Sequence, residues 1–436
     1  LRPFHFTSEA RPSMPVSSPP PEAPFEALSG VHLGIYGKSR SALDSEGIFT
    51  GPKVALDTGE ILGEFDPSAL RLDRFALQSV ARSILPKSQT AKCLRVPFRP
   101  TGAVDVFFSP RHQSASYGGL VTCHSVWVCP VCSAKISERR RVEIQSAIRA
   151  WEAQGGSVAL ATLTHGHGPH DPLADLLQRE QKALHSFFSC REGKRLMVIL
   201  GRVGHIRAWE VTHGRRRTLN NGWHPHFHIL LFLDGSPDLV SVEHDLFAVW
   251  LNACGLAGLP LPNRRHGLTL EDGTRAAQYV AKMGLEEART WGLGSEMTKG
   301  HIKRAKDGET PFDFLRSCLA CRDPQGRLLF REFAEAFRGK RQLVWSRGLR
   351  DRFDLENLSD AEVASSQEVD AELLARLSPE QWRLVIRRDA RGELLELARG
   401  GDWGPVARFL ETLEVLNHDP ERAARDASGP NRPVAA

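Results

Sequence analysis

The chain has 436 residues, of which 41% are hydrophobic and 25% charged, values typical of a globular protein with two or three domains. No apolar segment is long enough to span a bilayer, and residues 2–24 are proline-rich and polar, unlike a signal peptide, so we expect a cytoplasmic protein without a membrane partner. The net charge of +5 is unevenly distributed, because residues 354–436 carry 10 arginines, no lysine and 17 acidic residues. The basic remainder suits a polyanionic partner such as nucleic acid.

Residues 1–30 are rich in proline and serine, which predicts a disordered tail rather than a packed segment. Residues 31–135 form the next region, with short strand-like pieces at 103–109 and 118–123. This N-terminal region ends in a cysteine-rich element.

The cysteine-rich element contains the sequence CPVC, a tight turn that lets two thiolates bind one tetrahedral ion. Two cysteines upstream complete a possible set of four, with His124 as a substitute ligand. The predicted ligands of a structural zinc ion are Cys93, Cys123, Cys129 and Cys132. The alternative is a group of reduced, buried cysteines, which the reducing cytoplasm permits.

Residues 136–353 show the spacing of mixed helices and strands. The predicted elements are a helix at 134–151, a strand from 157, a helix at about 173–190, strands at 206–212 and 224–233, and helices at 242–254 and 274–290. This order favours an antiparallel sheet with helices on one side, an α+β arrangement, over a parallel doubly wound fold.

The apolar run HPHFHILLFL at residues 224–233 is a buried strand in this interpretation, and the two-residue spacing places His226 and His228 on one face. Two imidazoles make a weak metal site, so a third ligand is expected from a neighbouring strand. Glu210 lies on the preceding strand, which a glycine-containing loop joins to the histidine strand as a hairpin. If Glu210 is not the third ligand, His165 and His167 are the alternatives.

Two basic segments are candidates for contact with DNA. The loop between the two hairpin strands holds Arg215, Arg216 and Arg217, which could reach bases, and the segment 338–352 holds Lys340, Arg341 and Arg347, which could contact phosphates. Beyond it, residues 354–436 are predicted to form a separate, acidic, small helical domain. Its clearest helix starts at Ser378, with Pro379 at the first position and a capping box closed by Gln381.

Three motifs in a fixed order resemble those of HUH endonucleases of the rolling-circle plasmid replication initiator class, including the initiators called protein rep. They are a TLT strand at 162–164, the HPHFH strand at 224–228 and a YVAK helix at 279–282. The resemblance extends over about residues 90–400. It implies an HUH-like antiparallel sheet flanked by helices, within a domain at 136–353. It also implies site-specific nicking and rejoining of one strand of origin DNA.

In this resemblance Tyr279 is the nucleophile that becomes joined to the 5′ phosphate and leaves a 3′-hydroxyl primer. Lys282 lies one helical turn away and could neutralise a phosphate oxygen or favour the phenolate. The ion held by the histidines would be Mg²⁺ or Mn²⁺. Certain relatives carry a glutamate four residues before the tyrosine for termination, but Arg275 stands there, so Glu286, with Glu287 next, is the candidate base.

The implied partners are double-stranded origin DNA and single-stranded DNA, with host helicase and polymerase as further candidates; the sequence leaves the oligomeric state open. A single-tyrosine HUH transposase is the nearest alternative, although those proteins are shorter and lack the cysteine region. A zinc hydrolase built on the same histidines would need no tyrosine. A non-catalytic zinc-containing DNA-binding protein would need neither the histidines nor the tyrosine.

Overall fold

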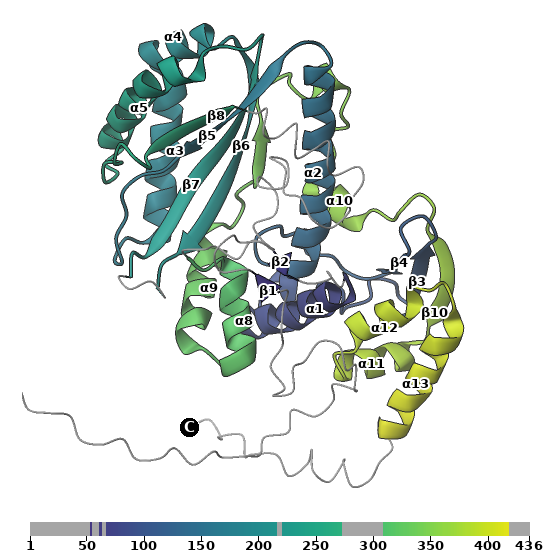
Figure 1. Ribbon diagram of the computed structural model, residues 1–436. Coiled ribbons are helices and arrows are strands. Elements are labelled where there is room, and N and C mark those ends of the chain that lie inside the picture. Colours follow the sequence, from purple (N-terminus) through teal and green to yellow (C-terminus); the bar gives the residue numbers. More distant parts are fainter. Residues whose placement is uncertain (1–52, 55–60, 63–66, 216–219, 273–307, 418–436) are drawn as a thin grey trace, which may run out of the picture. The chain divides into compact units, whose positions relative to one another are not determined.

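The structure is a computed structural model that describes residues 53–54, 61–62, 67–215, 220–272 and 308–417 (Figure 1). All of these belong to one unit, Gly51–Ala436. The predicted tail at 1–30 and the predicted helix at 274–290 lie outside the described residues. Helices and antiparallel sheets alternate along the described chain, so the α+β class is confirmed.

The central element is a five-stranded sheet in which every neighbouring pair is antiparallel. In spatial order its strands are β8 (Leu268–Asp272), β5 (Ser157–Leu163), β7 (Trp223–Leu233), β6 (Arg202–His213) and β9 (Leu343–Trp345). The predicted hairpin of the two central strands is present as β6 and β7. Its register places Glu210 directly opposite His226.

Alternation along β7 sends successive side chains into two different cores. Phe227 and Ile229 join the larger core with α3 (Leu173–Ser189) and α5 (Leu239–Leu256), whereas Leu230 and Phe232 pack against α2 (Pro130–Glu152). Figure 1 shows α3, α4 and α5 on one side of the sheet and α2 on the other. Both faces of the central strands are therefore covered, which explains the almost continuous apolar run in β7.

The remaining elements surround this sheet or form two smaller sheets, β1-β2 and β10-β3-β4. They are β1 (Lys53–Val54), β2 (Ile61–Leu62), α1 (Pro67–Ile84), η1 (Gln89–Ala91), β3 (Val104–Ser109), β4 (Ser114–Gly118), α4 (Arg191–Ile199), α8 (Pro311–Cys321), α9 (Pro324–Ala336), η2 (Asp351–Phe353), α10 (Asp360–Ser365), β10 (Glu372–Leu377), α11 (Pro379–Arg387), α12 (Arg391–Ala398) and α13 (Trp403–Asn417). Within the described ranges, no helix is both long and apolar enough to cross a bilayer.

The C-terminal part differs from the predicted separate helical domain. Strand β10 pairs with β3 in a three-stranded sheet of order β10-β3-β4. Val104, Tyr117 and Phe75 share a hydrophobic core with side chains of α11 to α13. The residues after 354 thus complete a core begun by the N-terminal region.

The local details of the C-terminal helices follow the sequence. Helix α11 begins with Ser378 as its N-cap and Pro379 at its first position, and the side chains of Ser378 and Gln381 form the predicted capping box. The predicted domain boundary at 135/136 falls inside α2, which begins earlier, at Pro130. Residues 118–123 form no regular strand beyond the end of β4; Leu120 makes only an isolated bridge to Pro97.

Candidate metal centres

The first candidate centre is the group formed by Glu210, His226 and His228, called the triad below. One ligand atom from each residue lies within 4.8 Å of the others. Glu210 comes from β6 and the histidines from β7, and all three side chains project from the face that packs against α2. The hairpin register thus brings the three predicted ligands together.

The ligand atoms of the triad converge on one point. The Nε2 atoms of His226 and His228 are 3.2 Å apart. An oxygen of Glu210 lies 2.9 Å from Nε2 of His228 and 3.6 Å from Nε2 of His226. Two imidazole nitrogens and one carboxylate on the same side form a three-ligand set that leaves further coordination positions for other groups.

The outer nitrogens of both histidines have partners of their own. Nδ1 of His228 lies 3.2 Å from Oγ1 of Thr162 on β5, and Nδ1 of His226 lies 3.4 Å from the carbonyl oxygen of His224. A carbonyl only accepts, so Nδ1 of His226 carries a proton, and Nε2 would offer its lone pair to a metal ion once it is deprotonated. Such outer hydrogen bonds fix the tautomer and the orientation of a metal-binding imidazole.

Glu210 is held as a carboxylate despite its surroundings. Burial alone would raise its pKa, but hydrogen bonds from His226 and His228 and the charges of these rings lower the pKa well below its usual value. A carboxylate that stays ionised in a buried site is ready to bind a cation without first losing a proton.

The alternative ligands His165 and His167 lie in the loop after β5. His165 is buried, donates from Nδ1 to the carbonyl of Gly166, and has its pKa lowered to about 4 by burial. The ring of His167 stacks on that of His224, with 4.5 Å between centroids. Neither belongs to the converging group, so within the described residues Glu210 is the third member.

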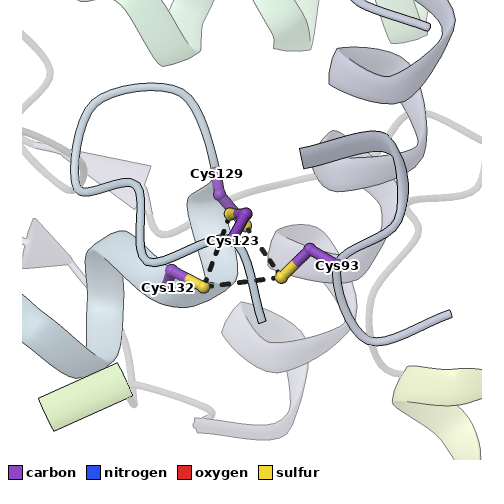
Figure 2. A group of neighbouring side chains, drawn as sticks. All are labelled: Cys93, Cys123, Cys129 and Cys132. Atoms are coloured by element: carbon purple, nitrogen blue, oxygen red, sulfur yellow. Dashed lines mark hydrogen bonds between the residues drawn. The ribbon is translucent and has the colours of Figure 1, made fainter. Parts of the chain in front are cut away.

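The second candidate centre is the group of four cysteines, called the sulfur site below (Figure 2). Its members Cys93, Cys123, Cys129 and Cys132 have sulfur atoms within 4.8 Å of one another. Three are buried and Cys123 is half-buried. The sulfur–sulfur separations include 3.5 Å between Cys93 and Cys132 and 3.7 Å between Cys123 and Cys132. All eight cysteines are free thiols, so no disulfide competes for these sulfurs.

Local backbone conformations bring the four sulfurs together. Cys93 and Cys123 are each followed by a residue in the left-handed region, Leu94 with φ of 49° and His124 with φ of 55°. Cys129 is the N-cap of α2, and Pro130 starts that helix. The positive end of a helix stabilises a thiolate at this position.

The electrostatics of the sulfur site favour one thiolate among four sulfurs. Burial would raise the pKa of Cys129, but hydrogen bonds from Cys123, Cys132 and Cys93 lower it well below the usual value. Hydrogen bonding with Cys123 in turn raises the pKa of Cys132. Four sulfurs in this arrangement match the ligand set of a tetrahedral zinc ion, which would hold all four as thiolates.

His124, the predicted substitute ligand, does not belong to the group of converging sulfur atoms and has other partners. Its Nε2 lies 2.7 Å from Oγ1 of Thr122 and 3.3 Å from Oγ of Ser365. Sequence reasoning missed a different neighbour: Nε2 of Gln78 on α1 donates to the sulfur of Cys129 at 3.2 Å, and Oε1 of Gln78 accepts from the fully buried Arg391 at 2.6 Å. These partners are 51 and 313 positions from Gln78, so no local pattern could reveal them.

The candidate DNA-contacting residues lie in different surroundings. The guanidinium of Arg215 is 5% exposed and pairs with Glu309 and Asp323, each at 2.6 Å. Nζ of Lys340 lies 5.0 Å from the ring centroid of Trp209. Arg341 and Arg347 are exposed. Arg216 and Arg217, and likewise the predicted catalytic residues Tyr279, Lys282 and Glu286, lie outside the described residues.

The chain leaves and re-enters the described structure beside the triad strands. Strand β8 ends at Asp272. The chain is described again from residue 308, and Glu309 and His213 exchange backbone hydrogen bonds of 2.8 and 2.9 Å at the end of β6. The described residues on either side of this gap, Asp272 and Glu309, therefore both lie in the sheet that carries the triad or are bonded to it; the YVAK motif at 279–282 lies outside the described residues.

Comparison with known proteins matches this part of the chain. The replication protein family matches residues 119–237, a range that contains three of the four clustered cysteines and the whole triad. The chain is also 27% identical over 372 residues to Protein rep of Streptomyces lividans, covering 68% of this chain and 80% of that protein. The predicted resemblance to plasmid replication initiators is thereby confirmed.

A second relative matches a shorter stretch. The chain is 35% identical over 141 residues to a protein of Streptomyces cyanogenus named neomycin resistance protein, and the match covers 27% of this chain and 31% of that protein. This chain spans about a third of that relative. No solved structure matches the chain.

Proposed function

We propose that this replication protein is an HUH endonuclease that nicks and rejoins one strand of plasmid origin DNA during rolling-circle replication. The observation that carries the proposal is the triad, in which two Nε2 atoms and a carboxylate oxygen converge inside the domain that matches replication proteins. A non-catalytic DNA-binding protein would have no use for such a ligand set with ordered outer hydrogen bonds.

The donor set of the triad fits a divalent cation such as Mg²⁺ or Mn²⁺. When bound, the cation would supply positive charge to the non-bridging oxygens of the scissile phosphate. His226, His228 and Glu210 would hold it, and Thr162 would orient the ring of His228 through its Nδ1 atom. The carboxylate of Glu210 is already ionised, so binding requires no change in its protonation.

The predicted nucleophile Tyr279 can reach the triad along the chain. Strand β8 ends at Asp272, opposite Ala159, three residues from the row where Thr269, Thr162 and His228 lie side by side. Three residues along the strand and two strand spacings across the sheet place Asp272 roughly 14 Å from His228. The seven residues from Asp272 to Tyr279 can span up to about 24 Å when extended. The covalent connection is long enough for the attack.

In the proposed reaction the phenolic oxygen of Tyr279 attacks the phosphorus, and the bond from phosphorus to the 3′ oxygen breaks. The phenolic proton is released, and the leaving 3′ oxygen takes up a proton to become the primer hydroxyl. Lys282 would neutralise phosphate charge during the attack, and Glu286 would activate the group that resolves the phosphotyrosine at termination. Rejoining reverses the first step with a new 3′ hydroxyl.

The other predicted contacts are assigned to DNA binding and to structure. Arg216 and Arg217 in the hairpin loop would read bases near the triad, and Lys340, Arg341 and Arg347 would contact phosphates. Arg215 shares the base-reading prediction, although its side chain pairs with two carboxylates in this structure. The sulfur site would hold one structural zinc. Origin DNA, single-stranded DNA and host helicase and polymerase would be the partners.

The decisive experiment tests for a covalent protein–DNA adduct. Full-length protein is incubated with supercoiled and single-stranded origin DNA and Mg²⁺ or Mn²⁺, and the adduct is detected after denaturation. Wild-type protein should form it, whereas Tyr279→Phe should bind DNA without forming it, because only the nucleophilic oxygen is removed. An adduct with Tyr279→Phe, or none with wild type, would contradict the proposal.

The structure supplies a matched control for this experiment. Tyr117 is one of three tyrosines in the chain, and its buried hydroxyl donates to the carbonyl of Arg391 at 2.8 Å. Burial raises its pKa well above the usual value, so it is a poor nucleophile. Tyr117→Phe should therefore form the adduct at the wild-type level, provided that it folds.

A further inference from the structure

A cavity of about 510 Å³ lies along β9, the edge strand next to β6. Its lining includes residues 341–348, which are β9 and the residues on either side of it, together with Arg140 of α2 and residues 357–360 at the start of α10. Ligand-binding pockets of a single nucleotide or small molecule have volumes of this order. The cavity belongs to neither candidate metal centre.

The register of β9 places this cavity beside the triad. Leu343 pairs with Ala208, and the backbone N–H of Trp209 donates to the carbonyl of Gln342 at 3.4 Å. Arg341 precedes Leu343 by two residues, as Glu210 follows Ala208 by two. When this antiparallel pairing is extended by two residues beyond the pair Ala208–Leu343, Arg341 stands opposite Glu210 on the same face of the sheet. In this extended register, Arg341 of the cavity lining would lie about one strand spacing from Glu210.

The walls of the cavity carry more positive than negative charge. Four arginines line it against two aspartates. Arg140 and Arg350 are engaged with Glu143, and Arg140 also binds Asp360 at 2.8 Å. The exposed Arg341 and Arg347 are the arginines of the lining that point their charge toward solvent. A phosphate entering here would meet guanidinium groups suited to bidentate contact.

Trp345 adds an aromatic surface and a hydrogen-bond donor. Its side chain packs partly against the core beneath α2, and Cζ of Arg350 lies 4.8 Å from its ring centroid. The indole Nε1 is buried and has no hydrogen-bond partner within the part of the chain that the structure describes. A buried donor without a partner is costly, and an oxygen acceptor of a ligand would satisfy it.

We propose that this cavity binds one nucleotide of the single strand that flanks the phosphate held at the triad. Arg341 and Arg347 contact the phosphates on either side of that nucleotide. Trp345 and Arg350 form the platform for its base, and the indole N–H donates to an acceptor on the nucleotide. The inference rests on the proposed function and adds to it a defined subsite for the unpaired strand.

Binding of short, single-stranded origin oligonucleotides, measured without cleavage in the Tyr279→Phe background, tests the subsite. Arg341→Ala and Arg347→Ala should each weaken binding and reduce the slope of log affinity against log salt by about 0.7. Trp345→Phe keeps an aromatic ring and removes the donor, so it should weaken binding about fivefold. Arg331→Ala removes an exposed arginine of α9 that does not line the cavity, and should bind like the parent.

A position-specific measurement keeps the test independent of folding defects. Oligonucleotides with 5-iodouracil at successive positions are photo-crosslinked to otherwise unmodified protein, and the attached peptide is identified by mass spectrometry. One position close to the nick should crosslink to the peptide that contains Trp345. Excess free deoxynucleoside monophosphate should leave this crosslink unchanged, because neighbouring phosphates contribute to binding.

The outcomes separate the subsite from the proposed function. If wild-type protein forms the covalent adduct but the three cavity variants bind like Arg331→Ala and no crosslink reaches Trp345, the subsite is wrong and nicking stands. If crosslinking is abolished by micromolar monophosphate, the ligand is a free nucleotide and the subsite is also wrong. If no adduct forms at all, the proposed nicking function fails first.

Discussion

The sulfur site and the triad are two groups of possible metal ligands with opposite construction. The sulfur site draws four thiols from the loop after η1, the segment before α2 and the start of α2. The triad draws three side chains from one hairpin whose strands are held by a ladder of backbone hydrogen bonds. Four ligands complete a tetrahedral shell, whereas three leave room for a substrate oxygen.

This contrast indicates what each site would do for the protein. The sulfur site packs with Val363 and Ala364 of α10 and is bonded to Gln78 of α1, so it joins segments far apart in sequence. The triad is positioned by cores on both faces of the sheet. We expect the first to govern stability and the second to govern chemistry.

The largest expected effect is loss of the fold when the sulfur site is broken. Cys132→Ser should remove about one zinc per chain and lower the melting temperature strongly, because zinc binding in small structural sites contributes on the order of 10 kcal/mol to folding. Elemental analysis and thermal denaturation measure both quantities. Cys254→Ser changes a buried cysteine of the main core and should leave the zinc content intact. Zinc-free wild-type protein that is fully folded would contradict the prediction.

The next effect is loss of activity with little loss of stability at the triad. Glu210→Ala, His226→Ala and His228→Ala should each reduce nicking by about 100-fold or more, since an incomplete ligand set holds a hard cation poorly. All three should behave alike. Nicking rates measured at increasing Mn²⁺ concentrations quantify the defect. Without Mn²⁺, the melting temperature of each triad variant should differ from that of wild type far less than the melting temperature of Cys132→Ser does. Normal nicking by Glu210→Ala would move the third ligand elsewhere.

The triad could be predicted from the sequence because its geometry is local. A two-residue spacing fixes the common face of His226 and His228, and the hairpin fixes which residues of the previous strand stand opposite. The helix at Ser378 was equally accessible, since a capping box involves residues only three positions apart. These features depend on neighbours along the chain and not on the rest of the fold.

Long-range pairing explains what the sequence could not predict. Residues 372–377, ELLARL, consist mainly of good helix formers, yet they form β10 because β3 offers an unpaired edge about 270 residues earlier. Arg215 sits in a polar loop that suggested a surface role, but Glu309 and Asp323 enclose its guanidinium. In both cases the deciding partner is distant in sequence.

A smaller effect compares the outer hydrogen bonds of the two sites. Thr162→Val removes the hydroxyl that holds Nδ1 of His228 and nearly preserves side-chain volume, so Mn²⁺ affinity should fall by about 10-fold. Gln78→Leu removes the bond to the sulfur of Cys129, together with the acceptor for the buried Arg391, and should speed zinc release to a chelator. Each variant should leave the other site unchanged. Metal titration and chelator kinetics on both proteins test this, and a crossed effect would show that the sites are coupled.

The last comparison concerns the sheet beneath the triad, where Glu180 of α3 is fully buried in the main core. One of its oxygens accepts from Nε1 of Trp209 at 3.0 Å, and the other has no hydrogen-bond partner among the described residues. Burial raises its pKa to about 8, and the hydrogen bond from Trp209 offsets only part of this increase. Trp209 precedes Glu210 and points to the opposite face of β6, so this carboxyl lies under the triad.

A raised pKa in the folded state means that the folded protein binds the proton more tightly than the unfolded chain does. The stability from this group is therefore complete below the ordinary carboxyl pKa of 4.5 and is lost as pH rises to about 8. A tenfold difference in proton affinity between the two states corresponds to about 1.4 kcal/mol.

Glu180→Gln keeps a hydrogen-bond acceptor for Trp209 but removes the titratable carboxyl group. The free energy of unfolding of this variant, relative to that of wild type, should therefore rise from pH 5 to pH 8. Urea denaturation at both pH values measures the difference, with the exposed Glu411→Gln as control. Parallel curves for wild type and Glu180→Gln would show that this carboxyl does not limit the stability of the sheet.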